Sequence, residues 1–403
     1  MTRIVSLAAR GDGLGEDGSH HPLTAPDDLV MADGQIEWGS HHIEPVCRHF
    51  GTCGGCQLQH VDDAAYSNFL IDRITSALAG QGVLSPSFDM PSISSPHTRR
   101  RVSLAAERNK GGVQIGFNEA GSHRLIDLAE CPVMHPSLFA LLKPLRSLLA
   151  SLLPERRRGN VRMTVVDQGI DVLLTGVEVE GLAATETVGA FAEKHRLARV
   201  SIDQGFGPTA WWEPEPVAIT LGGVPVPMPE GAFLQATEEG EQALVESIRS
   251  FVQGSRATVD LFSGLGTFAL SIDGRVHAVE GARDAVLALQ TAANRSERPI
   301  ATEHRDLFRR PLSAVELARF DAIILDPPRA GAKEQVAEIA ASGVPLLAYV
   351  SCNPSTFARD AKILIDGGYR LEFIKPVGQF RWSTHVELAA RFGRYAAQTV
   401  SAA

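Results

Sequence analysis

The chemistry that this sequence can support starts at one cysteine. Cys352 lies in YVSCNPST (349–356), directly after an apolar run that ends at residue 350. A cysteine at a strand end is often just a small buried hydrophobic residue. Here, however, Asn, Pro, Ser and Thr follow it, which are residue types that open a helix, and a helix N-terminus stabilises a thiolate. The stretch therefore predicts a nucleophilic thiolate.

A thiolate and a carboxylate together can methylate an unreactive pyrimidine carbon. C5 of a pyrimidine is a poor nucleophile, but attack of a thiolate on C6 makes C5 enolate-like and able to take a methyl group. A general base must then remove the C5 proton. Glu387 in RWSTHVELAARF is the candidate base. Its segment reads as a strand, with His385 two residues earlier on the same face.

These two residues need a scaffold that brings distant segments together. From about residue 231, short apolar strands alternate with helices, which is typical of βαβ units and a parallel sheet. Four predicted strands run into polar or glycine-rich turns, in DLFSGLGTF, RVHAVEG, ILDPPRAGA and YVSCNPST. Ligands of such sheets bind beyond the carboxyl ends of the strands. We therefore predict an α/β fold with a mostly parallel, doubly wound C-terminal sheet and a site at that edge.

The same edge holds the parts of a nucleoside pocket. Gly264 and Gly266 let a ligand approach the backbone, although their spacing is not the G-x-G-x-x-G of dinucleotide sites. Glu280 ends the next strand, where an acid accepts hydrogen bonds from ribose hydroxyls. Asp306 is placed to face an adenine amine, and Asp326 ends the third strand. The adenosine part fits NAD or S-adenosylmethionine, and the lack of a pyrophosphate site favours S-adenosylmethionine.

The other four cysteines form a separate set. CRHFGTCGGCQLQH holds Cys47, Cys53 and Cys56 on a glycine-rich loop, and Cys131 follows much later in LAECPVMHP. Three closely spaced thiols and a distant one predict a Cys₄ metal site. A tetrahedral zinc ion and an iron–sulfur cluster both satisfy that count, and ligand type alone does not separate them.

Length and composition set the frame. A chain of 403 residues exceeds one ordinary domain. We expect a short β-module over 1–45, a central α+β domain over 46–230 and a third domain over 231–403. No apolar stretch approaches the roughly 18 to 20 residues of a membrane span, and no signal peptide is evident, so a cytoplasmic protein without membrane contact is expected. A net charge of −9 argues against indiscriminate nucleic-acid binding, but leaves room for local basic runs in HTRRRVSLAAERNK and PERRRGNVRM.

The motifs DLFSGLGTF, DPPRAG, SCNPSTFARD and THVE resemble those of the RNA (uracil-5-)-methyltransferase family, in its order. The resemblance implies a Rossmann-like class I methyltransferase domain that uses S-adenosylmethionine. It also implies that Cys352 is the nucleophile and Glu387 the base. PEGAFLQAT resembles the family segment whose glutamine contacts the cofactor, here Gln235. Thr267 stands where the family usually has asparagine. By the same likeness, the cofactor and uracil site is lined by Gln235, Phe262, Gly264, Thr267, Glu280, Asp306 and Asp326.

The resemblance extends to metal and RNA. The C-x5-C-x2-C…C arrangement and the proline after Cys131 resemble the branch that carries a [4Fe–4S] cluster, which favours a cluster over zinc. HTRRRVSLAAE matches a family segment and makes Arg99, Arg100 and Arg101 candidate RNA contacts. The branch is mostly associated with 23S rRNA, so rRNA is favoured over tRNA, and a monomer is expected. The N-terminal module resembles a shortened oligonucleotide-binding barrel.

Three rival functions remain open at this point. A tRNA uracil-5 methyltransferase would use the same residues. An RNA cytosine-5 methyltransferase shares attack on C6, but typically carries cysteines in PC or TC contexts, whereas Asp326 is followed by PPR. A non-catalytic, metal-bound RNA-binding protein would not need Asp326, Cys352 and Glu387 together.

Overall fold

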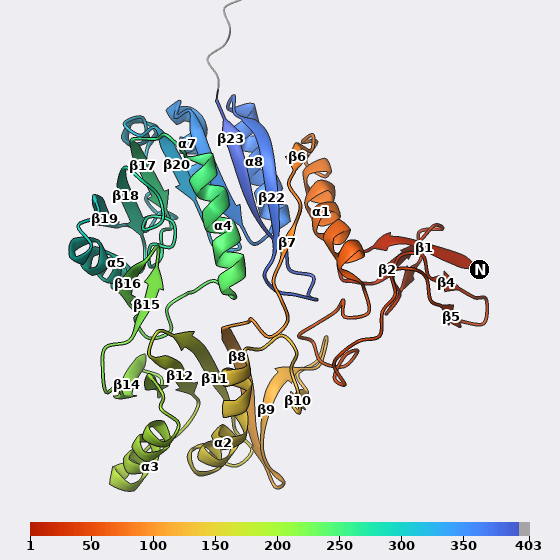
Figure 1. Ribbon diagram of the computed structural model, residues 1–403, viewed down its shortest axis with the longest axis vertical. Helices are drawn as coiled ribbons and strands as arrows, with labels where there is room; N and C mark the ends of the chain where they lie inside the picture. The colour runs from red at the N-terminus through yellow and green to blue at the C-terminus, as the bar shows by residue number, and fades with distance from the viewer. Residues whose placement is uncertain (395–403) are drawn as a thin grey trace, which may run out of the picture.

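The computed structural model describes residues 1–394, and its largest layer is the C-terminal sheet (Figure 1). The strand order is β19-β18-β17-β20-β21-β23-β22-β6, and β7 also pairs with β22. β23 runs antiparallel to both of its neighbours, whereas the other pairings are parallel. The strands are β6 (Ser87–Phe88), β7 (Ser92–Ile93), β17 (Ala257–Leu261), β18 (Arg275–Glu280), β19 (Ile300–His304), β20 (Ala322–Leu325), β21 (Leu346–Ser351), β22 (Arg370–Gly378) and β23 (Glu387–Gly393).

Helices bury both faces of this sheet, because its strands are apolar on both sides. In β20, Ile323 and Leu325 belong to one core, and Ala322 and Ile324 belong to the other. One core takes in α4 and α5, and the opposite core takes in α1, α6, α7 and α8. These helices are α1 (Asp63–Ala79), α4 (Glu238–Phe251), α5 (Arg283–Arg295), α6 (Ala314–Leu317), α7 (Lys333–Ser342) and α8 (Pro354–Asp366).

The chain reverses its direction of travel at β17. It moves outward from β17 to β18 and β19, and then returns to β20 and β21 on the other side of β17. A reversal of this kind opens a crevice beyond the carboxyl ends of the strands, where ligands of open α/β sheets bind. The predicted α/β class and doubly wound, mostly parallel sheet are confirmed.

The turn after β17 differs from its prediction. Phe262, Gly264 and Gly266 all have positive φ, at 62°, 53° and 94°. A Cβ on Gly266 would lie 2.4 Å from Leu289 Cδ1, whereas one on Gly264 would meet nothing within 4 Å. Gly266 thus serves packing against α5, and Gly264 leaves space beside the backbone. The helix predicted after this turn is replaced by turns and bends over 262–272, because the left-handed residues interrupt a right-handed helix.

The segment 63–93 belongs with the C-terminal sheet rather than with the central domain predicted over 46–230. α1 buries one stripe of apolar side chains against α8 and β22. β6 and β7 then pair with β22. Motifs in this stretch are short, and the pairing partner lies almost 300 residues later in the chain, so local sequence could not reveal it.

The central region is built on a seven-stranded sheet of order β10-β9-β8-β11-β12-β13-β14. α2 (Pro136–Leu152) and α3 (Gly181–Lys194) pack on it through the third apolar core. A hairpin follows, and it packs against α5 of the C-terminal layer. The strands are β8 (Arg101–Asn109), β9 (Gly112–Asn118), β10 (Leu125–Asp127), β11 (Arg158–Val166), β12 (Gly169–Thr175), β13 (Arg199–Asp203), β14 (Pro208–Trp212), β15 (Ala218–Leu221) and β16 (Val224–Pro227).

The N-terminal residues form a small sheet of order β3-β2-β1-β4-β5. Buried Asp28 joins the loop before β4 to the segment after β5, because its carboxylate accepts from the backbone N–H groups of Ala25 and Gly39. Among residues 1–394, no helix combines the length and apolar character needed to cross a membrane. The strands are β1 (Thr2–Leu7), β2 (Gly13–Gly15), β3 (His20–His21), β4 (Leu29–Val30) and β5 (Ile36–Glu37).

Candidate active site

The candidate nucleophile and the candidate base face each other across two adjacent strands. β21 ends at Ser351, which opposes Leu388 of β23 in the antiparallel register. One further step along each strand brings Cys352 opposite Glu387. The pairing of β21 with β23, rather than any nearness in sequence, therefore sets the thiol beside the carboxyl.

The resting environment of Cys352 contradicts the expectation of a stabilised thiolate. α8 does begin directly after it, at Pro354, with Asn353 as the N-cap. Nevertheless, burial together with the charges of Glu387 and Asp326 raises the pKa of the thiol to about 11, and Arg329 opposes this only in part. Burial and two nearby carboxyls outweigh the helix N-terminus, so Cys352 is a thiol at neutral pH in the resting protein.

Glu387 has the environment of a proton acceptor that works near neutrality. Its side chain is only 8% exposed. Burial raises its pKa to about 7, while a hydrogen bond from Gln379 and the charges of Arg101 and Arg329 pull the pKa back down. Charged and neutral forms are thus both populated at neutral pH, which suits general base catalysis.

The turn after β20 is fastened to the turn that carries the thiol. Asn353 caps α8 by accepting from the Ser355 N–H, at 3.1 Å, and its Nδ2 donates to the Arg329 carbonyl oxygen, at 3.0 Å. The Thr356 hydroxyl donates to the same oxygen, at 3.2 Å. Burial, and then the charge of Glu387, raise the pKa of nearby Asp326 well above its usual value. Through the two hydrogen bonds to the Arg329 carbonyl oxygen, the turn after β20 and the turn that carries Cys352 form one rim.

The glycine turn and Glu280 form one unit, as expected from the sequence. Glu280 accepts from the Gly264 N–H at 3.0 Å and from the Ala282 N–H at 2.7 Å. The carboxylate therefore fixes the turn, in addition to any bond that it makes to a ligand. The rings of Phe262 and Phe308 lie 5.3 Å apart at the same edge and offer an apolar wall.

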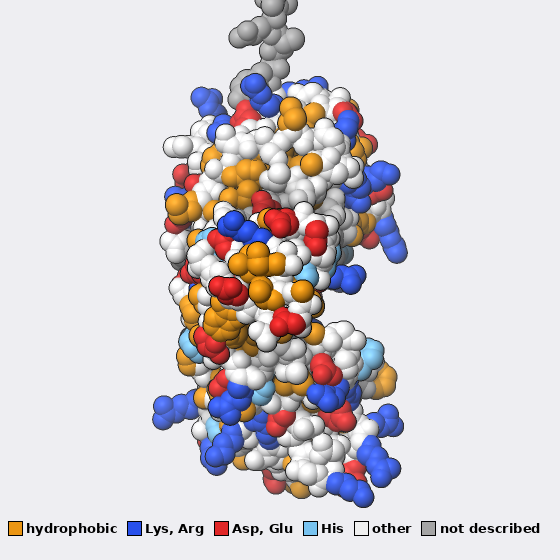
Figure 2. Space-filling view, turned by 90° about the vertical axis from the view of Figure 1, so that its right-hand side faces the viewer, with side chains coloured by type: hydrophobic (Ala, Val, Ile, Leu, Met, Phe, Trp, Pro, Cys, Tyr) orange, Lys and Arg blue, Asp and Glu red, His pale blue; other side chains and the backbone are white. Residues whose placement is uncertain are grey.

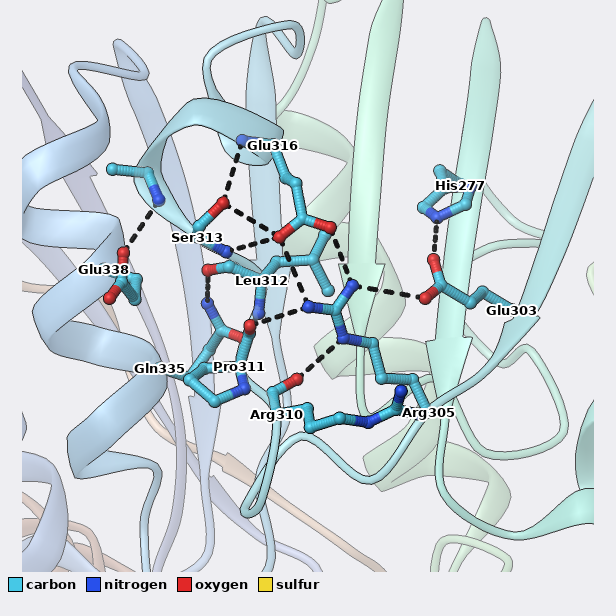
Figure 3. A network of polar contacts seen from close by, with 11 residues as sticks. His277, Glu303, Arg305, Arg310, Pro311, Leu312, Ser313, Glu316, Gln335 and Glu338 are labelled. Carbon is cyan, nitrogen blue, oxygen red and sulfur yellow. Dashed lines mark hydrogen bonds and ion pairs between the residues drawn. The ribbon is translucent and has the colours of Figure 1, made fainter.

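The loop that begins with Asp306 is held by a network around Arg305 (Figure 3). The Asp306 carboxylate accepts from the backbone N–H groups of Phe308 and Arg309. Arg305 donates to the carbonyl oxygens of Arg310 and Pro311 and to the carboxylate of Glu316. The loop is thereby fixed at both ends beside the Gly264 turn.

The structure places Gln235 and Thr267, two further predicted cofactor residues, in different surroundings. Gln235 is buried, and its carbonyl oxygen accepts from Arg100 Nε at 3.2 Å. Thr267 instead lines a groove against α4, together with Gln242 and Arg249. Gln235 thus joins the candidate active site through Gln379, described below, whereas no contact here ties Thr267 to the other site residues.

The four remaining cysteines line a single cavity: Cys47, Cys53, Cys56 and Cys131. Two contacts bring their loops together. The Arg48 backbone N–H donates to Glu130, and the Ala129 N–H donates to His49 Nε2 at 3.0 Å. The predicted association of the distant Cys131 with the other three is therefore seen in the structure.

All four thiols are partly buried. Burial raises the pKa of each, and that of Cys56 rises to about 12. Within residues 1–394, no three His, Cys, Asp or Glu side chains are arranged closely enough to hold a single metal ion. The cavity brings together four sulfur atoms, which are soft metal ligands.

Comparison with known proteins adds a family. A family model described as tRNA (uracil-5-)-methyltransferase matches residues 227–393. An uncharacterized RNA methyltransferase of Zymomonas mobilis is 51% identical over 394 residues, which cover 97% of this chain and 99% of that protein. The 23S rRNA (uracil(1939)-C(5))-methyltransferase RlmD of Thiobacillus denitrificans is 33% identical over 376 residues, covering 88% and 86%. The chain belongs to the RNA uracil-5-methyltransferase family.

The fold agrees with that family. The structure of the Pyrococcus abyssi tRNA (uracil-54, C5)-methyltransferase in complex with S-adenosyl-L-homocysteine is similar, with a TM-score of 0.73. At 22% identity it covers 97% of this chain and all of its own, which shows a shared fold. The predicted membership of the RNA uracil-5-methyltransferase family is confirmed.

Of the arginine run, Arg100 is not available for the predicted RNA contact, whereas RNA binding by Arg99 and Arg101 stays a prediction. Arg100 is buried, pairs with Glu241 at 2.7 Å and cannot reach a phosphate. Arg99 packs on the rings of Phe117 and Phe380, and Arg101 packs on Phe233. Arginines that follow one another on an extended strand alternate between faces, so the run could not act as one basic patch.

Sequence reasoning missed Gln379 and the clamp made by Asn353. Gln379 is buried beside Glu387, but a glutamine in GQFRW has no recognisable spacing to any motif. Asn353 had a signal, because Asn before Pro is a helix N-cap, although its second contact with Arg329 depends on the fold.

Proposed function

We propose that this protein transfers the methyl group of S-adenosylmethionine to C5 of a uridine in 23S rRNA. The pairing of Cys352 with Glu387 across β21 and β23 carries the proposal. Thiolate attack on C6 and proton removal from C5 require a thiol and a base on one small ring, and neighbouring strand positions meet that requirement.

The protein's own residues account for each bond change. Cys352 gives its proton to solvent as the substrate binds, Sγ bonds to C6, and the C5–C6 electrons shift to C5, in conjugation with the C4 carbonyl. C5 then takes the methyl group, and Glu387 accepts the C5 proton. The electrons of that C–H bond re-form the double bond as the C6–S bond breaks, which restores the thiolate. Because the pKa of Cys352 starts near 11, deprotonation must accompany substrate binding.

The cofactor site fits S-adenosylmethionine at the edge around the Gly264 turn. A Cβ on Gly264 would stand in open space, Glu280 is oriented by two backbone N–H groups, and Phe262 and Phe308 supply an apolar wall. When bound there, the sulfonium supplies the methyl group. Glu280 would accept from ribose hydroxyls, and Asp306 would face the adenine.

RNA is the expected macromolecular substrate, and the relative RlmD acts by its name on 23S rRNA. Basic side chains gather at the end of the molecule formed by the central sheet, at the bottom of Figure 2. Lys110, Arg156, Arg157 and Arg158 of the central region are exposed. Such residues supply phosphate contacts that carry no sequence information, whereas the burial of Glu387 requires that the target base be extruded to reach it.

We further propose that Cys47, Cys53, Cys56 and Cys131 hold a [4Fe–4S] cluster. The four thiols line one cavity, and thiolates are the ligands of such clusters. Methyl transfer needs no redox step, so the cluster would order the surrounding loops. Metal analysis and the visible absorption of anaerobically purified protein distinguish a cluster from zinc.

Covalent trapping tests the catalytic proposal. RNA containing 5-fluorouridine should form a stable adduct with the wild-type protein and S-adenosylmethionine. Fluorine replaces the C5 hydrogen that the base would remove as a proton, so the C6–S bond cannot break. Cys352→Ala should form none. Mapping of 5-methyluridine in rRNA and tRNA from a deletion strain identifies the substrate. Methylation in tRNA alone would favour a tRNA enzyme, 5-methylcytidine would favour the cytosine-5 alternative, and absence of any adduct would favour a non-catalytic RNA-binding protein.

A further inference from the structure

One buried carboxamide connects the two halves of the proposed site. Gln379 follows β22 directly and is 2% exposed. Its Oε1 accepts from the Ala236 N–H at 2.9 Å, and its Nε2 donates to Gln235 Oε1 at 2.9 Å. It also lies beside Glu387, because Val377, two residues earlier in the chain, pairs with Glu387 of β23, and a hydrogen bond from Gln379 holds the pKa of Glu387 down. A single group thus contacts both the predicted cofactor residue and the predicted base.

The orientation of this carboxamide is fixed. A backbone N–H can only donate, so the atom that meets Ala236 must be the amide oxygen. The amide nitrogen then carries two hydrogens, one for Gln235 and one for the carboxylate of Glu387. The backbone is also closed around it, because a Cβ on Gly240 would lie 2.6 Å from Gln379 Cβ.

We propose that Gln379 is a positioning residue that sets the side chains of Gln235 and Glu387 relative to each other. Since Gln235 accepts through its oxygen, its amino group is turned away from Gln379 and offers donors to an oxygen of the bound ligand. Since Glu387 receives an N–H from Gln379, its carboxylate is favoured in the charged form. The inference rests on the proposed function, because it assigns these two partners their roles.

Other charged groups face Glu387 and must be held constant in any test. Cys352 follows β21, Asp326 follows β20, Arg101 begins β8, and Arg329 lies on the turn after β20. A change at Gln379 alters none of these residues. The matched control is Gln335→Met, because Gln335 is equally buried but bonds only to the backbone of Leu312.

The test compares Gln379→Met with Gln335→Met and wild type. The limb of the kcat–pH profile that reports the ionisation of Glu387 should move to higher pH, by about one unit, in Gln379→Met. The reason is that the charged carboxylate loses the amide N–H that stabilises it. Gln335→Met should leave the limb in place even where its stability falls. An unmoved limb in folded Gln379→Met overturns the proposal. If that variant does not fold, Gln379→Leu serves instead, since it also removes the donor and adds no charge beside Glu387, and an unmoved limb there also overturns the proposal.

A second readout separates this inference from the proposed function. Carbon-13 NMR of labelled glutamate carboxyls, with the Glu387 signal assigned by its loss in Glu387→Gln, gives the titration of that group without turnover. An upward-shifted titration in Gln379→Met supports the positioning role even if wild type methylates no uridine, which would defeat the proposed function alone. An unshifted titration defeats the positioning role even if wild type is active.

Discussion

The Gln57 backbone N–H donates to the carbonyl oxygen of Trp382 over 2.8 Å. This bond joins the loop that ends at Cys56 to the segment that leads into Glu387. The Leu58 N–H donates to the same oxygen, also at 2.8 Å. The loop of the four-cysteine cavity is therefore hydrogen-bonded to the segment that precedes β23 and the candidate base Glu387.

Loss of one thiol from the cavity should reach the active site through this contact. If the cavity holds the proposed cluster, Cys56→Ser should lose iron, melt at a lower temperature and form 5-methyluridine more slowly, because the loop that contacts Trp382 is released. Metal analysis, thermal unfolding and a methyl-transfer assay on the same preparation check this. Cys352→Ser is the control that should keep its iron and stability while losing activity. An iron-free Cys56→Ser protein with the wild-type rate of methylation would show that the contact of this loop with Trp382 does not support the active site.

The buried base should make the folded protein less stable at high pH. Burial raises the pKa of Glu387 from 4.5 to about 7, so the folded state binds the proton more tightly than the unfolded state. Stability is therefore full below the unfolded pKa and falls as the pH rises from 4.5 through 7, by at most about 3 kcal/mol. Glu387→Gln removes this effect.

We expect the free energy of unfolding of Glu387→Gln to exceed that of wild type by up to about 3 kcal/mol at pH 8, with a much smaller gain at pH 5. Urea unfolding at both pH values measures the two differences. Glu334→Gln, an exposed change on α7, should differ little from wild type at either pH. Equal gains for Glu387→Gln at both pH values would contradict a raised pKa in the folded state.

The sequence predicted the parts of the site better than their state. Strand ends and the Gly264 turn follow local patterns, and Cys352 and Glu387 were predicted from a polar turn and from the family resemblance. The raised pKa of Cys352 was not, because it depends on Glu387 and Asp326, which the sheet brings in from other strands. Gln379 and the burial of Arg100 escaped for the same reason, since a single residue type carries no record of its distant partners.

The clamp between the two turns should be separable from the helix cap. Asn353→Ala removes both the cap of α8 and the donor to the Arg329 carbonyl, whereas Asn353→Ser keeps a cap and removes only that donor. We expect Asn353→Ala to lose about 1 kcal/mol of stability and Asn353→Ser to lose little. Both should lower kcat, because the rim beside Cys352 loosens. Wild-type kcat in Asn353→Ser would show that the clamp is not needed.

The arginine run and the exposed basic residues should respond in opposite ways. Arg100 is buried against Glu241, and its Nε also holds the Gln235 carbonyl. Arg100→Met should therefore cost about 3 kcal/mol of stability by leaving a buried carboxylate unpaired, with no change in the salt dependence of RNA binding by the folded protein. Arg157→Ala, at an exposed position, should leave stability intact and reduce the slope of log affinity against log salt by about one if it contacts a phosphate. Urea unfolding and RNA titrations at several KCl concentrations measure both quantities. A shallower salt slope with unchanged stability in Arg100→Met would restore Arg100 as an RNA contact.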